Sequence, residues 1–264
     1  GKEGEDITQN LLTINDIPKS ILAKYFPTEI DIRGEVFIQN EDFKLDNPIW
    51  HALNETHKQY AVEYNGCKFY KPEYSPFGGM GEGGNTALAS DQYSKLTSLF
   101  YMVGDPPIAG SSARIKKQLT ANQMILYKPF PFEITETIVR LETGKQKKEL
   151  YELVNFVQPG FIREKTAAMG TYFGIYSDKQ LVAVSGERVE MNSYSEVSAV
   201  VTHPDFRKRG YAKQLLKQTT DKIFSDRKIP ILHVDENNSS AIGLYEQLGF
   251  VTRRKMGFCL LEAV

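Results

Sequence analysis

The chain has 264 residues, of which 41% are hydrophobic and 25% charged, ordinary proportions for a globular chain and not for a disordered or fibrous one. Its 32 Lys and Arg residues balance 33 Asp and Glu residues, which leaves a formal charge of -1 and no global basic field for nucleic acid. No apolar run approaches the ~20 residues that cross a bilayer, and no signal peptide is recognisable. We therefore expect a cytoplasmic protein of one large or two modest domains, without a membrane or nucleic-acid partner.

The two cysteines, Cys67 and Cys259, are too few to hold a zinc cluster by themselves. They also make a weak case for a disulfide, and we interpret them as buried free thiols in a reducing compartment. No metal cofactor is expected.

Residues 1–45 read differently from the rest of the chain. Helix-spaced apolar residues precede Pro18 and Pro27, which keep any helix short because each proline lacks an amide donor. An alternating apolar stretch over 30–38 then suits a half-buried strand.

The sequence of residues 46–135 predicts a small region that contains both helices and strands. The patterns indicate helices over 50–63 and 91–98 and strands over 67–70, 99–103 and 123–127. The glycine run at 78–84 lacks the strand–Gly-x-Gly-x-x-Gly–helix context of a dinucleotide loop, so we interpret it as a flexible surface loop.

Residues 136–264 carry the clearest periodicity. They predict helices over 146–157, 210–224 and 239–248 and strands over 172–176, 181–189, 196–202, 231–234 and 251–261. Strands followed by alternating helices and strands favour an α/β (α+β) protein, in which helices pack on a mixed sheet.

The segment from Val200 to Ala212 is the most informative for chemistry. A strand ends, a loop with three basic residues at 207–209 follows, and Gly210 opens an amphipathic helix. The unpaired amides of a first helical turn, together with the positive end of the helix dipole, favour a phosphate or pyrophosphate. The alternative is a solvated basic helix start without a ligand.

A second segment supports the interpretation that this helix start binds a ligand. Asn238 stands at the start of the last predicted helix, and Ala241 and Tyr245 are four residues apart, so they share a face of it. Tyr245 would then lie beside whatever the first helix anchors and could offer a phenolic proton. Taken singly, an aromatic residue on a helix is more often part of the core.

Together the two segments resemble the GNAT superfamily, the acetyl-CoA-dependent N-acyltransferases. The pattern R/Q-x-x-G-x-G/A matches at Arg207, Gly210 and Ala212, and N-x-x-A-x-x-x-Y…G-F matches from Asn238 to Phe250. The resemblance implies a mixed, mostly antiparallel sheet flanked by helices, with acetyl-CoA as cosubstrate and a small-molecule or peptide amine as acceptor. It also implies a catalytic domain over 136–264 and a degenerate GNAT-like N-terminal lobe over 46–135.

The resemblance further implies which residues act. Tyr245 would protonate the departing CoA thiolate. Coenzyme contacts are implied for Val200, Val201, Thr202, Arg207, Lys208, Arg209, Gly210, Tyr211, Ala212 and Asn238.

Direct attack by an amine needs no covalent enzyme intermediate, but an amine with a pKa near ~10 must lose its proton first. Glu196 is our candidate general base, with Glu187 as the substitute, although each is also explained as a solvent-facing strand residue. His203 is interpreted as shaping the turn before Pro204, and His233 as a strand histidine rather than a base.

Residues 1–45 are similar to the adenylation domain of NAD-dependent DNA ligases, through G-E-D-I-T at 4–8 and I-R-G-E-V-F at 32–37. In that family the equivalents of Arg33, Gly34 and Glu35 help bind the adenylate. No Lys-x-Asp-Gly nucleophile motif occurs, and two cysteines cannot supply the ligase's four-cysteine zinc site. We interpret the segment as a ligase fragment joined near 43–46 to an acetyltransferase, and expect no ligase activity.

Three functional hypotheses follow. The leading one is an N-acetyltransferase, the second a non-catalytic acyl-CoA-binding or regulatory module, and the third binding of NAD or AMP by the ligase-like segment. The sequence does not identify the acceptor or the oligomeric state. An acidic cleft opposite the thiol would indicate polyamine, aminoglycoside or lysine acceptors, whereas a basic cleft would indicate carboxylated amines such as amino acids.

Overall fold

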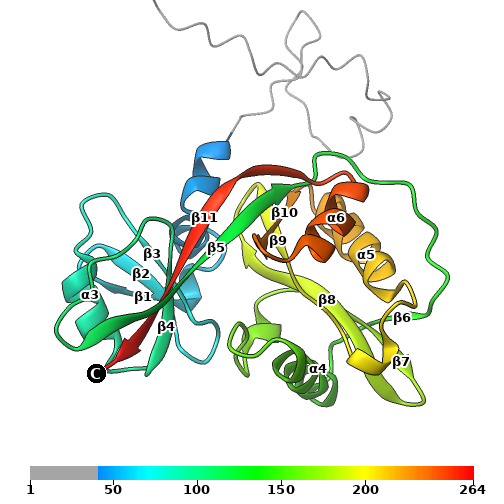
Figure 1. Ribbon diagram of the computed structural model, residues 1–264, viewed down its shortest axis with the longest axis horizontal. Coiled ribbons are helices and arrows are strands. Elements are labelled where there is room, and N and C mark those ends of the chain that lie inside the picture. The colour runs from blue at the N-terminus through cyan, green and yellow to red at the C-terminus, as the bar shows by residue number, and fades with distance from the viewer. Residues whose placement is uncertain (1–40) are drawn as a thin grey trace, which may run out of the picture. The chain divides into compact units, whose positions relative to one another are not determined.

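The structure, a computed structural model, describes residues 41–264 (Figure 1). The short helix and the strand expected within residues 1–40 lie outside the described residues. The described helices are α2 (Pro48–Asn54), α3 (Thr86–Tyr93), α4 (Gly144–Val157), α5 (Tyr211–Ser225) and α6 (Ser239–Gln247), with 3-10 turns η3 (Asp42–Asp46), η4 (Lys58–Tyr60), η5 (Thr166–Ala168) and η6 (Pro204–Phe206).

Within residues 41–264, eleven strands form one sheet in the order β1-β2-β3-β4-β11-β5-β10-β9-β8-β7-β6. Their bounds are β1 (Ala61–Tyr64), β2 (Cys67–Tyr70), β3 (Phe77–Met80), β4 (Leu99–Val103), β5 (Ala113–Ile125), β6 (Ile138–Arg140), β7 (Tyr172–Ser177), β8 (Gln180–Glu190), β9 (Tyr194–Thr202), β10 (Ile229–Asp235) and β11 (Val251–Ala263). Two neighbouring pairs, β3 with β4 and β9 with β10, run parallel, and the others run antiparallel. The expected mixed, mostly antiparallel sheet is therefore confirmed.

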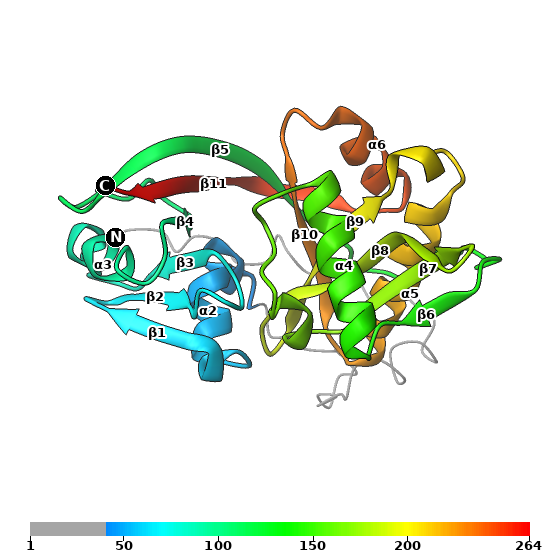
Figure 2. The same ribbon diagram turned by 90° about the horizontal axis from the view of Figure 1, so that it is seen from below.

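Two long strands connect the half that contains β1–β4 with the half that contains α4–α6 (Figures 1 and 2). β5 and β11 are 13 residues each and pair antiparallel along nearly their whole length. β5 also pairs with β10 over Ala121–Ile125, so it lies between β10 and the last strand of the chain. The first half therefore supplies a central strand to the sheet of the second half. The sequence predicted only the last part of β5, because residues 114–118 are exposed on both faces and show no alternation.

The helices of the second half form where their periodicity predicts them. Thr143 and Gln146 make a capping box at the start of α4, whose Leu150 and Val154 are buried against the sheet. In α5, Leu215 and Leu216 are fully buried, and each such side chain contributes about 1.5–3 kcal/mol of burial free energy. The helices predicted over 146–157, 210–224 and 239–248 agree with α4, α5 and α6 within two residues at each end.

The loop predicted for the glycine run is wrong at its start, because Gly78 and Gly79 are buried within β3. A Cβ on Gly79 would lie 2.7 Å from the backbone nitrogen of Trp50 in α2, and a Cβ on Gly78 would lie 2.3 Å from the ring of Phe69. Gly79 therefore permits close packing of β3 against α2, and Gly78 leaves room for the Phe69 ring of β2. Turn propensity does not distinguish this reason for a glycine from a loop.

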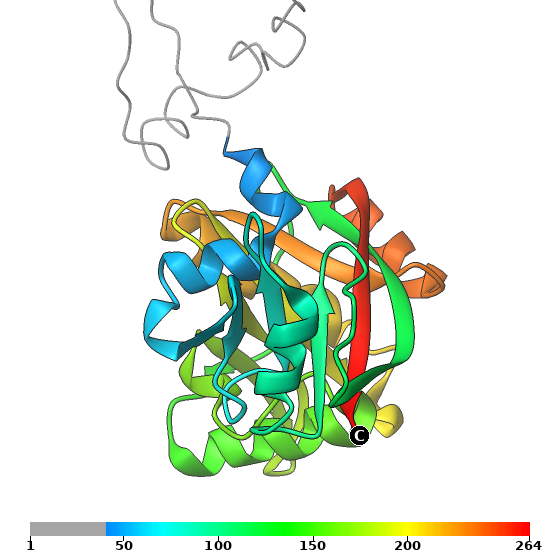
Figure 3. The same ribbon diagram turned by 90° about the vertical axis from the view of Figure 1, so that its left-hand side faces the viewer.

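The first half, which faces the viewer in Figure 3, has its own aromatic core beside α3. Phe69 and Tyr93 stack with ring centroids 4.2 Å apart, and Phe100 meets both rings edge-on. Cys67 and Cys259 are buried in the same cluster as free thiols, as the sequence predicted. α3 begins at Thr86, five residues before the predicted helix, because Asn85 caps it by accepting a hydrogen bond from the Leu88 amide.

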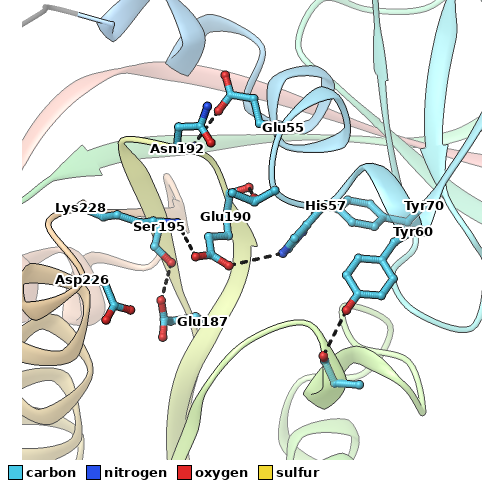
Figure 4. Close-up of polar contacts among 12 residues, drawn as sticks. Glu55, His57, Tyr60, Tyr70, Glu187, Glu190, Asn192, Ser195, Asp226 and Lys228 are labelled. Atoms are coloured by element: carbon cyan, nitrogen blue, oxygen red, sulfur yellow. Dashed lines mark hydrogen bonds and ion pairs between the residues drawn. The ribbon is translucent and has the colours of Figure 1, made fainter.

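A buried polar cluster links the first half to the end of β8 (Figure 4). His57 follows α2, and its Nδ1 lies 2.9 Å from the hydroxyl of Tyr70. Its Nε2 lies 3.8 Å from Glu190, which also pairs with Lys228. The His57 side chain is 2% exposed, and burial lowers the pKa of His57 from 6.5 to about 4. The histidine is therefore neutral at neutral pH.

Candidate active site

The central feature of the site is a divergence between two parallel strands. β9 and β10 pair only at their first residues, and the pairing ends at Glu196 opposite Ile231. Beyond that point, the edge of β9 that faces β10 is not paired with β10, so its backbone groups are available to a ligand.

A bulge in β9 marks the same place. In the pairing with β8, Gly186 lies opposite Ser198 and Val184 opposite Val201, so β9 accommodates an extra residue there. Ala199 has a φ of 52°, a left-handed conformation that costs a non-glycine residue free energy. The bulge redirects the backbone around the predicted coenzyme-binding residues Val200, Val201 and Thr202.

The gap between the strands holds a pocket of about 220 Å³, here called the inner pocket. Residues 197–200 of β9, 232–235 of β10 and 119–121 of β5 form three of its walls. The end of α4 with its following loop and the start of α6 close it, and Arg188, Phe161 and Phe258 complete the lining.

A wider pocket of about 760 Å³, here called the outer pocket, continues from the inner one at Val200 and Tyr245. It is lined by residues 200–202, the loop and first turn of α5 over 206–213, and one face of α6. All the residues for which we expected coenzyme contacts line this pocket, and their roles stay predictions.

The basic loop fits a phosphate. Arg207, Lys208 and Arg209 are exposed, and the Arg209 guanidinium lies over the Phe206 ring at 4.8 Å. Gly210 caps α5 with a φ of 78°, and nothing lies within 4 Å of where its Cβ would be, so backbone conformation rather than space favours glycine here. The first turn of the 15-residue helix α5 lines the outer pocket, so its amides are placed to bind an anion there.

Tyr245 and Asn238 line both pockets. Burial raises the pKa of Tyr245 to about 12, so the phenol keeps its proton at neutral pH. Asn238 caps α6, because its Oδ1 accepts a hydrogen bond from the Ala241 amide at 3.1 Å. Both residues lie where the sequence places them, beside the basic loop.

Glu196 is fully engaged by two partners. Its carboxylate accepts hydrogen bonds from Arg188 at 2.9 and 3.0 Å, and from Nδ1 of His233 at 2.9 Å. Burial alone would raise its pKa, but the charge of Arg188 and the contact with His233 outweigh burial and lower the pKa of Glu196 to about 2. Such a carboxylate is too weak a base to take a proton from an amine directly. Its geometry suits orienting His233 instead.

His233 lies in the wall of the inner pocket, edge-on to Phe258. It lies on a strand, as expected, but its hydrogen-bond contacts are of the kind that a general base would have. Gln123 on β5 donates through Nε2 to the Leu45 carbonyl at 2.8 Å and also contacts Nε2 of His233 at 3.0 Å. Because an amide NH₂ only donates, Nε2 of the imidazole is the acceptor and Nδ1 carries the proton that Glu196 accepts.

The remaining candidates lie elsewhere. Glu187 is buried and lines neither pocket; its carboxylate accepts a hydrogen bond from the hydroxyl of Ser195 at 2.7 Å. The Nδ1 of His203 accepts a hydrogen bond from the Asp205 amide, which confirms that this histidine shapes the turn. Sequence reasoning did not single out Arg188 or Gln123.

The comparisons with known proteins identify the family and the fold. The profile of the FR47-like protein family matches residues 172–259. The structure is similar to that of a putative acetyltransferase from the GNAT family of Novosphingobium aromaticivorans, with a TM-score of 0.76 and 30% identity, over 83% of this chain and 98% of that one. A GCN5-related N-acetyltransferase of Kribbella flavida shares the fold, with 10% identity and a TM-score of 0.54 over 86% and 96% of the two chains. The chain belongs to the GNAT acetyltransferase family.

The start of the chain matches a different family. The profile of the NAD-dependent DNA ligase adenylation domain matches residues 1–66. A DNA ligase of Pelagibacter ubique is 73% identical over 44 residues, which are 17% of this chain and only 6% of the ligase. The expected ligase-like segment is therefore confirmed, and the chain spans a small part of the ligases it resembles. No helix of residues 41–264 is long and apolar enough to cross a membrane.

Proposed function

We propose that the protein transfers an acetyl group from acetyl-CoA to a primary amine by direct attack. The observation that carries the proposal is the continuity of the two pockets: the outer pocket begins at the basic helix start, and the inner pocket opens between diverging strands beside Tyr245. A long substrate with a phosphorylated end and a reactive end would span both. The thioester supplies an activated acyl group when it is bound.

The chain itself would then contribute three groups to the reaction: backbone amides of β9, His233 and Tyr245. Backbone amides on the unpaired edge of β9 would stabilise the oxyanion, since they are fixed before the reaction begins. His233, held by Glu196, would take the amine proton at Nε2 once the contact with Gln123 gives way. Glu196 therefore acts as a positioning residue for the base.

Tyr245 would assist the leaving group. With a pKa of about 12, the phenol is a weaker acid than a thiol with an ordinary pKa near ~8.5, so complete proton transfer to sulfur would run uphill. A hydrogen bond from the phenol to the departing sulfur is the contribution that its protonation state favours.

Release of free CoA from acetyl-CoA in the presence of an amine tests the proposal. The Tyr245→Phe variant should bind CoA as the wild type does and lower kcat by at least tenfold. Tyr176→Phe is a matched control, because that phenol bonds to Glu149 of α4 and lines neither pocket. Saturable CoA binding without turnover across a broad amine panel would refute the proposed acetyltransferase activity and favour a CoA-binding module.

A further inference from the structure

Arg188 is the only Lys or Arg among the described residues that line the inner pocket. Its guanidinium lies 4.6 Å from the centroid of the Phe77 ring, and the residue as a whole is 8% exposed. It donates two hydrogen bonds to Glu196 and one to the Phe161 carbonyl at 3.3 Å. A guanidinium carries about five N–H donors, so two remain for a ligand in the pocket.

Arg188 and His233 are held close together by one atom. Nη2 of Arg188 and Nδ1 of His233 each lie 2.9 Å from the same oxygen, Oε1 of Glu196. The two nitrogens are therefore less than about 6 Å apart. A molecule that touched both side chains would carry its two recognised groups only a few bonds from each other.

The rest of the inner pocket disfavours a second positive charge. Asp235 is the only carboxylate among its described lining residues, and it is exposed. Its Oδ1 already accepts hydrogen bonds from the backbone and side-chain nitrogens of Asn237, at 2.8 and 3.1 Å. A polyamine or an aminoglycoside would place further ammonium groups against walls whose only described carboxylate is Asp235, which is already shared with Asn237.

Most of the other lining residues have apolar side chains, and the space is small. Phe161, Ile162, Leu119 and Phe258 are among the apolar lining residues. The volume of about 220 Å³ is below the ~300–1,000 Å³ of sites for drug-sized ligands, and part of it must hold the acyl group.

We propose that the acceptor is a small amino acid with an apolar side chain, whose carboxylate binds Arg188 and whose amine faces His233. This inference rests on the proposed function. The amine nitrogen forms a bond to the acyl carbon as the carbon–sulfur bond breaks; the amine proton passes to His233, and the sulfur leaves as a thiolate that takes up a proton. The acceptor's carboxylate offsets the imidazolium that forms, because the charge of Arg188 is already balanced by Glu196.

The test compares amino acids with their amides, which keep the amine and the side chain but lack the charge. CoA release is measured with alanine, valine and leucine, with the three amides, with tripeptides that begin with the same residues, and with spermidine. We expect kcat/KM for the best free acid to exceed that of its amide and its tripeptide at least tenfold, since a charged hydrogen-bonding partner is lost. Equal use of acid and amide, or a preference for the tripeptide or spermidine, would overturn the inference and leave the acetyltransferase proposal standing.

An Arg188→Lys variant links the preference to the residue, since lysine keeps a charge to pair with Glu196 but loses the planar fork. The acid-to-amide ratio should fall at least fivefold, mainly through KM for the acid, whereas Arg140→Lys, at an exposed position of β6, should leave it unchanged. If Arg188→Lys does not fold, the wild-type comparison alone decides. If no amine in the panel releases CoA, the proposed function fails and the acceptor assignment falls with it.

Discussion

Acid should destabilise this protein through His57, and replacing that histidine should remove the effect. His57 connects α2 to η4 and is enclosed by the Tyr60 and Tyr70 rings and by Glu190 of β8 (Figure 4). Burial lowers its pKa, and although the nearby Glu190 carboxylate opposes this effect, the folded value is about 4.

The sign and size follow from linkage between protonation and folding. The unfolded chain takes up the proton at the ordinary pKa of 6.5, whereas folded His57 takes it up at about 4. The contribution of His57 to stability is therefore fully present above pH 6.5 and is lost progressively as the pH falls toward 4. Between pH ~7.5 and ~5 the loss is about 2 kcal/mol, and below pH ~4 it approaches about 3.4 kcal/mol.

Urea unfolding at several pH values between ~7.5 and ~5 measures this loss. His57→Gln removes the titrating group and keeps an amide that can bond to Tyr70. We expect its stability to fall by about 2 kcal/mol less than that of the wild type over this range, because the carboxylates common to both proteins cancel in the difference. His51→Gln, at a half-buried position in α2, the helix that precedes His57, is the control and should follow the wild-type curve more closely. Parallel loss of stability in wild type and His57→Gln would show the reasoning to be wrong.

Three other outcomes test the fold and the site. Glu196→Gln leaves Arg188 buried without its counter-charge and should cost about 3–5 kcal/mol in denaturant unfolding, much of it recovered when both residues become methionine. Arg209→Gln should weaken CoA binding several-fold in calorimetry, by less at ~0.5 M salt than at ~0.05 M, because an exposed charge is screened. Gly79→Ala should lower the free energy of unfolding by about 1–3 kcal/mol, since its Cβ would meet the Trp50 backbone at 2.7 Å.

The sequence predicts the second half of the fold well because there each element carries its own signal. The Thr143 cap, the apolar stripe of α5 and the hairpin turn at 177–180 each act within a few residues. It predicts the basic loop and Tyr245 for a related reason, since a phosphate-binding helix start and a residue on one helix face are local patterns.

The inner pocket could not be predicted in the same way. Arg188 and Glu187 are neighbours on β8, and because successive strand residues face opposite sides, only Arg188 reaches the pocket. Which of the two does so depends on irregular pairing between β8 and β9, between Glu187 and Glu190, and no periodicity places such a bulge. His233 meets Glu196 only because β10 pairs in parallel with β9 after a helix of 15 residues has crossed between them.

The same dependence explains why the first half of the described chain matters for chemistry. Its strand β5 contributes Leu119, Thr120 and Ala121 to the wall of the inner pocket, and Gln123 of that strand sets the tautomer of His233. The ring of Phe77 on β3 packs against the guanidinium of Arg188. A chain without these strands would keep the basic loop and Tyr245, and so could still hold a phosphorylated coenzyme. It would lose one wall of the inner pocket and contacts that hold Arg188 and His233 in place, so under the proposed function the selection of the amine depends on both halves.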